Sequence, residues 1–319
     1  MNKTILTTLT VMALLVSCRG QQAKATGQLE TKGEVQLPAA NGPATAQDPA
    51  PSREKTFDIR IKNPDDSIRI VRLLEDEPSS RVDNLMLYYG RHFIDIPYVA
   101  YTLDQDKEEG LVINTEELDC TTYVENVLAL ATCAKRGYTS FADFCKVLAQ
   151  VRYAGGEVAY TSRQHYFTYW MTCNKADGLI EDVELPQPPL SAKRKPHVDY
   201  MTTHVESYKM LNAHRQWLPE IKEMERKVNA TTLNIVPKEQ LRNSNRYREY
   251  IHDGDIIGIV TNKKGLDISH VGLAVWHEDG LHLMNASSIH KKVIDEPMTL
   301  YQYLQKQTSR VGICLMRMK

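Results

Sequence analysis

The sequence predicts an α+β fold, with helices in the first part of the folded region and an antiparallel β-sheet in the last third. Two observations support this prediction. Apolar residues recur with the period of a helix between residues 67 and 153, and short β-type runs separated by Gly, Asn and Asp follow residue 252. Helices that come first and strands that come later are typical of α+β domains, in which each kind of element packs together.

The helical regions share apolar stripes at helical spacing and end at polar residues or breakers. We expect them at residues 67–96 with a break at 77–80, at 120–135, at 140–153, at 162–174 and at 203–228. A short extended piece at 97–103 and a strand-like stretch at 110–117 precede the helix that begins at residue 120. A proline-rich loop is expected at 185–196.

The strands of the predicted sheet alternate with turn residues. We expect them at residues 253–262, 268–276, 281–288 and 311–318, with "HEDG" joining the second and the third as a hairpin. If Trp276 pairs near Leu281, Asn285 lies on the strand next to His270 and can reach its ring.

The composition is that of an ordinary globular protein. Of 319 residues, 42% are hydrophobic and 25% are charged, and 39 basic side chains stand against 40 acidic ones. This balance lacks the positive excess that marks nucleic-acid binding, so we expect no nucleic-acid partner. Beyond the amino terminus no apolar run reaches about eighteen residues, and no membrane-spanning helix is therefore expected.

The amino terminus has the pattern of a secreted protein. "MNKTILTTLTVMALLVSC" combines an early lysine with an apolar stretch, and its end, "LVSC", resembles a bacterial lipoprotein signal. This resemblance implies cleavage before Cys18 and lipidation of its thiol, which anchors the protein to a bacterial membrane in the cell envelope, on the periplasmic side or at the outer membrane. We expect residues 1–17 to be the signal peptide, residues 18–56 a flexible linker, and residues 57–319 the folded domain.

Five cysteines follow Cys18, an odd number that leaves at least one thiol unpaired. They form no CxxC pair, which argues against a zinc site and against a thioredoxin-like motif. Cys133 and Cys145 lie in apolar helical segments and are expected to be buried. Cys120 differs because it stands where a helix begins, a position that lowers the pKa of a thiol. Asp119, directly before it, is expected to cap this helix, and a contact to the amine of a bound substrate is the alternative.

A cysteine nucleophile requires a base, normally a histidine that is held by a third polar group. His270 opens a predicted strand, and Asn285 lies on the next one, where its amide can fix the tautomer of the ring. Other chemistries have weaker support. "HEDGLH" at residues 277–282 has one residue too many for a zinc-protease motif and straddles a turn, and no GxSxG, GxGxxG or phosphate-binding loop is present.

The order of these motifs resembles the NlpC-like branch of the papain-like cysteine hydrolases, and more closely a family described as N-acetylmuramoyl-L-alanine amidase-like. The motifs are "PYVAYTLD", "EELDCTTYVENVLALA", "RYAGGEVAYTSRQHYFTYW", "SHVGLAVW" and "NASSIHKKV", and the likeness spans about residues 70–319. It implies a papain-like domain in which Cys120 is the nucleophile, His270 the general base and acid, and Asn285 the orienting residue. It also implies that the Tyr98 hydroxyl helps to bind the oxyanion.

The sequence departs from the family pattern at two places. The third catalytic position is often histidine, whereas this chain has Asn285, an amide of the kind that serves papain-like proteases. The two glycines that usually follow the Tyr98 segment are replaced by Tyr101 and Thr102, which changes the expected wall of the cleft.

A polar cluster at Arg152, Arg163, His165 and Tyr166 leaves two interpretations open. It is either a buried structural network or a substrate site in which Arg163 pairs with a carboxylate of an acidic muropeptide stem.

The sequence therefore predicts a lipid-anchored cell-wall hydrolase that cleaves an amide bond of peptidoglycan or muropeptides through an acyl-enzyme on Cys120. No metal and no organic cofactor are expected. The family label favours the bond between muramic acid and L-Ala, and a D-Glu-linked peptide bond is the alternative. A non-catalytic lipoprotein that binds peptidoglycan is a further possibility, for which a charged helical insertion at about 190–250 could serve as the docking element.

Overall fold

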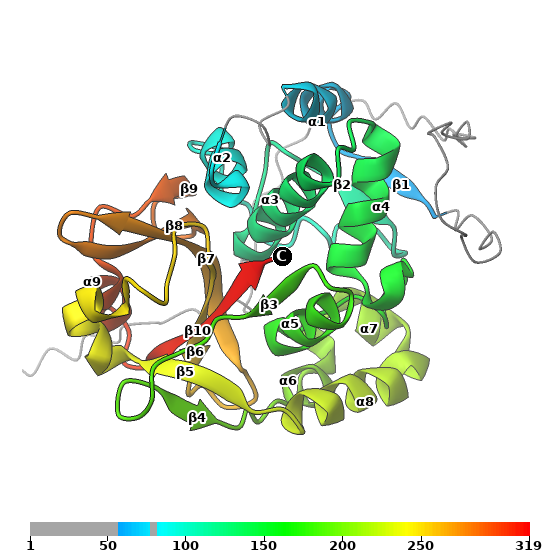
Figure 1. Ribbon diagram of the computed structural model, residues 1–319. Helices are drawn as coiled ribbons and strands as arrows, with labels where there is room; N and C mark the ends of the chain where they lie inside the picture. Colours follow the sequence, from blue (N-terminus) through cyan, green and yellow to red (C-terminus); the bar gives the residue numbers. More distant parts are fainter. Residues whose placement is uncertain (1–56, 77–81) are drawn as a thin grey trace, which may run out of the picture. The chain divides into compact units, whose positions relative to one another are not determined.

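The structure is a computed structural model that describes residues 57–76 and 82–319 (Figure 1). Residues Lys55–Lys319 form one compact unit. The predicted signal peptide, Cys18 and the whole of the predicted linker lie outside the described residues. In the described part of the chain, no helix combines the length and the apolarity that crossing a membrane requires.

The helices follow the predicted order. They are α1 (Asp65–Glu75), α2 (Leu85–His92), α3 (Cys120–Lys135), α4 (Phe141–Arg152), α5 (Phe167–Ala176), α6 (Tyr200–Thr203), α7 (Lys209–Ala213), α8 (Leu218–Asn229) and α9 (Leu300–Gln305). The start of α3 at Cys120 is as predicted. The expected single helix at 203–228 is instead broken into short pieces, and α8 begins next to Pro219, a residue that is tolerated in the first turn of a helix but not in its interior.

The strands form one large antiparallel sheet and one small parallel pair. Along the large sheet the order is β4-β5-β10-β6-β7-β8-β9, and β3 pairs with β10 away from this path. Its strands are β3 (Ile180–Asp182), β4 (Ala192–Arg194), β5 (Leu233–Pro237), β6 (Ile256–Thr261), β7 (Ile268–His277), β8 (Gly280–Ser287), β9 (Lys292–Asp295) and β10 (Arg310–Met318). The small pair joins β1 (Ile59–Ile61) to β2 (Leu111–Ile113).

This arrangement confirms the predicted α+β class with its antiparallel sheet. Trp276 pairs with Leu281, as the sequence predicts for the hairpin of β7 and β8. The sequence does not predict β4 and β5 as strands. Because both belong to the large sheet, the expected insertion at about 190–250 is not helical throughout. Its α-helices lie within residues 200–229, and a 3-10 helix follows at Lys238–Tyr247.

The large sheet has an apolar layer on each face. Side chains alternate along β7, so Val271, Leu273 and Val275 belong to the core that contains α3, whereas Ala274 belongs to a second core that contains α9. The helix α3 contacts α2, α4, β7 and β8, and Figure 1 shows it between the other helices and the sheet. The helix is buried along almost its whole length, which explains why its sequence is apolar on more than one side.

All five cysteines of the described region are free thiols. Cys133 and Cys145 are 0% and 1% exposed, which confirms that they act as small core residues. Cys120, by contrast, stands at the end of α3 that meets the sheet.

Candidate active site

Cys120 is the first residue of α3, and Asp119 caps this helix. Asp119 Oδ1 accepts a hydrogen bond from the main-chain N–H of Thr122 at 2.8 Å, and Thr122 Oγ1 accepts one from the main-chain N–H of Asp119 at 2.9 Å. This reciprocal pair is a capping box, which confirms the predicted cap and fixes the residue at which the helix begins. The position of the thiol is fixed with it.

The Cys120 thiol is protonated at neutral pH in this environment. Burial, followed by the charge of Asp119, raises the pKa of Cys120 to about 12, although the main-chain N–H groups of Val271 and Thr121 act in the opposite direction. The sequence-based expectation of a lowered pKa is therefore wrong for this state of the site. The loss of hydration outweighs the favourable field of the helix N-terminus.

His270 and Asn285 meet across the strands β7 and β8. His270 Nε2 lies 2.7 Å from Asn285 Oδ1, and the two residues are 5% and 0% exposed. Because the amide oxygen can only accept, Nε2 carries the ring proton and Nδ1 keeps a lone pair. Gly272 allows the strands to approach, since a Cβ at this position would meet Met284 O at 2.5 Å. The register thus supplies a histidine whose second nitrogen can accept a proton.

His270 is neutral at physiological pH. Burial and, to a smaller extent, the charge of Arg310 lower its pKa to about 4, although the hydrogen bond to Asn285 opposes this shift. Cys120 and His270 therefore form a neutral thiol and a neutral imidazole at rest. Within the described residues no hydrogen bond joins them.

Glu296, a residue that the sequence analysis missed, lies behind Asn285. Its side chain is fully buried, and Oε1 is 3.5 Å from Asn285 Nδ2 and 3.2 Å from Ser287 Oγ. Asn285 Nδ2 also donates to Leu283 O at 3.3 Å. These acceptors hold the amide so that its oxygen faces His270. No motif announces this role, because Glu296 reaches Asn285 only through the pairing of β8 with β9.

Two tyrosines flank the candidate pair. The ring of Tyr303 on α9 lies 6.1 Å from that of His270, and the charge of a Cys120 thiolate would act on Tyr303 as well as on Tyr98. The main chain of Tyr98 bridges to Leu118, just before the helix cap. Burial raises the pKa of Tyr98 above its usual range, so its hydroxyl keeps its proton and can donate it in a hydrogen bond. Sequence reasoning singled out Tyr98 but not Tyr303.

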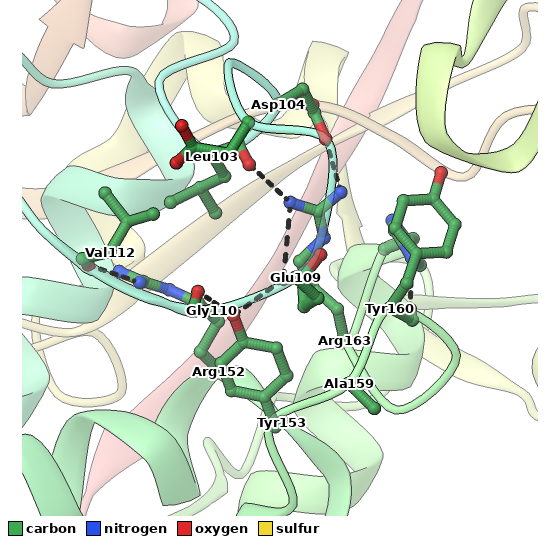
Figure 2. Close-up of polar contacts among 12 residues, drawn as sticks. Leu103, Asp104, Glu109, Gly110, Val112, Arg152, Tyr153, Ala159, Tyr160 and Arg163 are labelled. Atoms are coloured by element: carbon green, nitrogen blue, oxygen red, sulfur yellow. Dashed lines mark hydrogen bonds and ion pairs between the residues drawn. The ribbon is translucent and has the colours of Figure 1, made fainter. Parts of the chain in front are cut away.

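Arg152 and Arg163 belong to a buried polar network, and Figure 2 shows its contacts. Arg152 Nε binds Glu125 Oε2 at 2.6 Å, which ties α4 to α3. Arg163 pairs with Asp104, donates to Leu103 O at 3.4 Å, and lies 3.7 Å from Glu109 Oε1. The terminal N–H groups of Arg163 that could bind a substrate carboxylate are therefore already bonded to these residues. The structure thus favours the structural interpretation of this cluster.

His165 and Tyr166 also bind other parts of the chain. His165 Nε2 lies 2.8 Å from Tyr160 O, and Tyr166 donates its hydroxyl proton to Glu225 Oε1 at 2.8 Å. The second bond connects the loop before α5 to α8. In the described residues neither side chain makes a hydrogen bond to Cys120, His270 or Asn285. The structure thus brings Asp119, Cys120, His270 and Asn285 to the start of β7, with Tyr98 beside them, and places the "SRQHY" side chains elsewhere.

Comparisons with known proteins identify the family of this chain. The sequence profile of a family described as AmiA-like, N-acetylmuramoyl-L-alanine amidase-like, matches residues 88–313. An N-acetylmuramoyl-L-alanine amidase from Bacteroides uniformis is 36% identical with a TM-score of 0.68, over 74% of this chain and 97% of its own. A candidate xylanase from Bacteroides fragilis is 37% identical with a TM-score of 0.67, over 73% and 100%.

A more distant structure, protein LPG0564 from Legionella pneumophila, shares the fold. It is 21% identical with a TM-score of 0.61, over 79% of this chain and 94% of its own. The comparison with curated proteins gives no match.

Replacing Asp119 by Asn tests how the environment sets the reactivity of the thiol. Asn keeps a capping oxygen but removes the negative charge that raises the Cys120 pKa. We expect Cys120 to react with iodoacetamide about three- to tenfold faster near pH 7.5, as a pKa lowered by about half a unit to one unit would produce. Mass spectrometry of the peptide that contains Cys120 measures the rate.

Asp182→Asn is the matched control, because Asp182 is an exposed carboxylate that pairs with Lys175 and is remote in sequence from α3. It should leave the rate unchanged. Equal rates for Asp119→Asn and the wild type, with α3 intact by circular dichroism, would contradict this account of the thiol.

Proposed function

Because this chain belongs to the N-acetylmuramoyl-L-alanine amidase-like family of cell-wall hydrolases, we propose that it hydrolyses an amide bond of peptidoglycan fragments with Cys120 as the nucleophile. The observation that carries the proposal is the 2.7 Å contact between His270 Nε2 and Asn285 Oδ1. The next residue of β7, Val271, directs its main-chain N–H at the Cys120 thiol, so the histidine and the thiol lie at the same place in the fold. A cysteine, a histidine and an orienting amide are the parts that papain-like hydrolases use.

The proposed reaction proceeds through an acyl-enzyme. His270 Nδ1 takes the proton of the Cys120 thiol while Sγ attacks the amide carbonyl carbon, and the imidazolium then gives this proton to the leaving amine. Water, deprotonated by the same nitrogen, attacks the thioester and releases the acid and the free thiol. Asn285 keeps Nε2 protonated throughout, so that Nδ1 faces the reacting groups.

The resting state supports transfer of the proton during attack rather than before it. A thiol with a pKa of about 12 does not give its proton to an imidazole with a pKa of about 4 unless a substrate stabilises the products. Two donors are available for the developing oxyanion, the main-chain N–H of Cys120 at the start of α3 and the Tyr98 hydroxyl. A bound substrate therefore supplies the carbonyl whose developing negative charge these donors stabilise, and this allows the proton to move from Cys120 to His270.

The substrate class follows from the family. The amidase from Bacteroides uniformis is named for the bond between N-acetylmuramic acid and L-Ala, and we assign this bond to the present chain as its substrate. The D-Glu-linked peptide bond is the alternative within the same chemistry. Both bonds are amides, so the two reactions follow the same steps. They differ in which part of the muropeptide forms the thioester with Cys120.

Glycan hydrolysis, suggested by the candidate xylanase, has less support from the site. Glycosidases use two carboxyl groups about 5 to 9.5 Å apart on either side of the scissile bond. The acidic residues next to the candidate triad are Asp119, which caps α3, and Glu296, which is 0% exposed and faces Asn285. Both carboxylates already serve the positioning of Cys120 and Asn285.

We further propose that Cys18 carries the lipid that anchors the domain to a membrane of the cell envelope, on the basis of "LVSC". Mass spectrometry of the protein isolated from a bacterial membrane fraction should show a chain that begins at Cys18 and carries acyl groups. A soluble chain with an unmodified amino terminus would refute the anchor.

The nucleophile is tested by Cys120→Ala on defined muropeptides. We expect kcat/KM to fall at least about 10³-fold, because no other group can form the acyl-enzyme. The control is Cys173→Ala, which removes a half-buried thiol of α5 and should retain activity. Mass spectrometry of the wild-type products identifies the bond: a stem peptide that begins with L-Ala marks the amidase, and an L-Ala–D-Glu dipeptide marks the endopeptidase.

Three outcomes would overturn the proposal. They are full activity of Cys120→Ala, cleavage of xylo-oligosaccharides instead of muropeptides, and binding of muropeptides by the folded wild type without any product.

The pH profile tests His270 as the base. Its pKa is lowered from 6.5 to about 4, so the ring is neutral and can accept a proton above about pH 4, and it loses this ability as the pH falls through that value. The acid limb of kcat/KM should therefore lie near pH 4. In Asn285→Ala the limb should shift to still lower pH, because the bond to Asn285 raises the pKa, and kcat should fall because the ring loses its orientation.

Circular dichroism at each pH separates loss of activity from acid unfolding. An acid limb at the ordinary histidine value in the folded wild type would contradict the assignment of a buried, neutral base.

A further inference from the structure

The hairpin of β7 and β8 brings together two histidines that the proposed reaction does not use. Val275 pairs with His282, so His277, two residues further along β7, lies on the same face as His282. Asp295 joins this face from β9, where it pairs with Met284. One ligand atom from each of His277, His282 and Asp295 lies within 4.8 Å of the others. These are the two histidines of "HEDGLH", whose spacing does not fit a zinc-binding helix. The hairpin turn nevertheless brings their rings together.

The contacts of His282 prepare one nitrogen for a ligand. Its Nδ1 lies 2.8 Å from Glu296 O, an acceptor, so Nδ1 carries a proton and Nε2 keeps its lone pair in the neutral ring. A main-chain carbonyl that fixes the other nitrogen in this way is the usual outer contact of a metal-binding histidine. The side chain is 2% exposed and therefore held in place.

The lone pair of His282 Nε2 faces another acceptor. Asp279 Oδ1 lies 2.8 Å from it, and His277 Nε2 lies 2.9 Å from Asp295 Oδ2. The two rings stack at 4.0 Å with their planes 10° apart. Both nitrogens of His282 thus face oxygen acceptors, and Nε2 meets its acceptor either through a proton or through a bound cation. Asp295 Oδ1 is also buried without a hydrogen-bond partner among the described residues, so this carboxylate has a further oxygen to offer.

We propose that His277, His282 and Asp295 bind a divalent transition-metal ion. Two imidazoles with carboxylate oxygens suit Zn²⁺, which accepts nitrogen and oxygen ligands in tetrahedral sites. The ion fastens the hairpin of β7 and β8 to β9 and takes no part in the cleavage step. Exposure of 38% for the His277 side chain and 28% for that of Asp295 lets the ion enter from solvent. The inference is independent of the reaction proposed for Cys120.

Zn²⁺ binding to the full chain tests this site. Cys18→Ala and Cys120→Ala form the background of every sample, because free thiols at these positions would bind Zn²⁺ themselves. Equilibrium dialysis with metal analysis should show one Zn²⁺ per chain, together with a higher melting temperature that a chelator reverses. Co²⁺ in place of Zn²⁺ should give visible absorption without the thiolate charge-transfer band.

His277→Ala and Asp295→Asn should each weaken Zn²⁺ binding by more than about 100-fold, above the 10- to 100-fold cost of losing an outer contact of a metal ligand. Both residues are partly exposed, so the variants should fold, and circular dichroism verifies this. His92→Ala, an exposed histidine of α2, is the control and should bind as the background does.

Two results would overturn the site. Absence of Zn²⁺ uptake at micromolar concentrations would show that protons alone join the histidines to the carboxylates. Uptake that persists in the folded His277→Ala and Asp295→Asn variants would place the ion elsewhere in the chain.

Discussion

The antiparallel register of β7 and β8 is the constraint on which the rest of the candidate site depends. A shift of one residue would move every side chain of β7 to the opposite face and separate His270 from Asn285. The short hairpin at Glu278 and Asp279 sets this register, and the close approach at Gly272 maintains it. One pairing therefore aligns His270 with Asn285 and, at the other end of the strands, the two stacked histidines.

The helix α3 contributes the thiol through a different principle. Its cap at Asp119 determines where the helix starts, while its buried sides determine where the helix lies against the sheet. The pair of Glu125 with Arg152 adds a charged contact in the middle of this apolar packing. Such a pair is costly to break from one side, since the remaining charge would be buried without a partner. The cap in the first turn of α3 and the buried pair of Glu125 with Arg152 together fix the position of Cys120.

Much of this could be predicted from the sequence, because local signals and pairing rules determine it. The cap at Asp119, the start of α3 and the pairing of Trp276 with Leu281 all follow from residue types at short range. The parts that could not be predicted depend on burial or on distant pairing. The raised pKa of Cys120 arises from dehydration in the assembled core, and Glu296 reaches Asn285 only through β9. Local pattern reasoning also overlooked β4 and β5, which gain their partners across long stretches of chain.

A protonated, buried thiol has a consequence for the lifetime of the protein. Oxidants attack the thiolate, and a cysteine that keeps its proton at neutral pH is a poor target for them. The environment of Cys120 that slows its reaction at rest therefore also protects it from conversion to sulfenic and sulfinic acids. The desolvation that keeps the Cys120 thiol protonated thus also slows its oxidation.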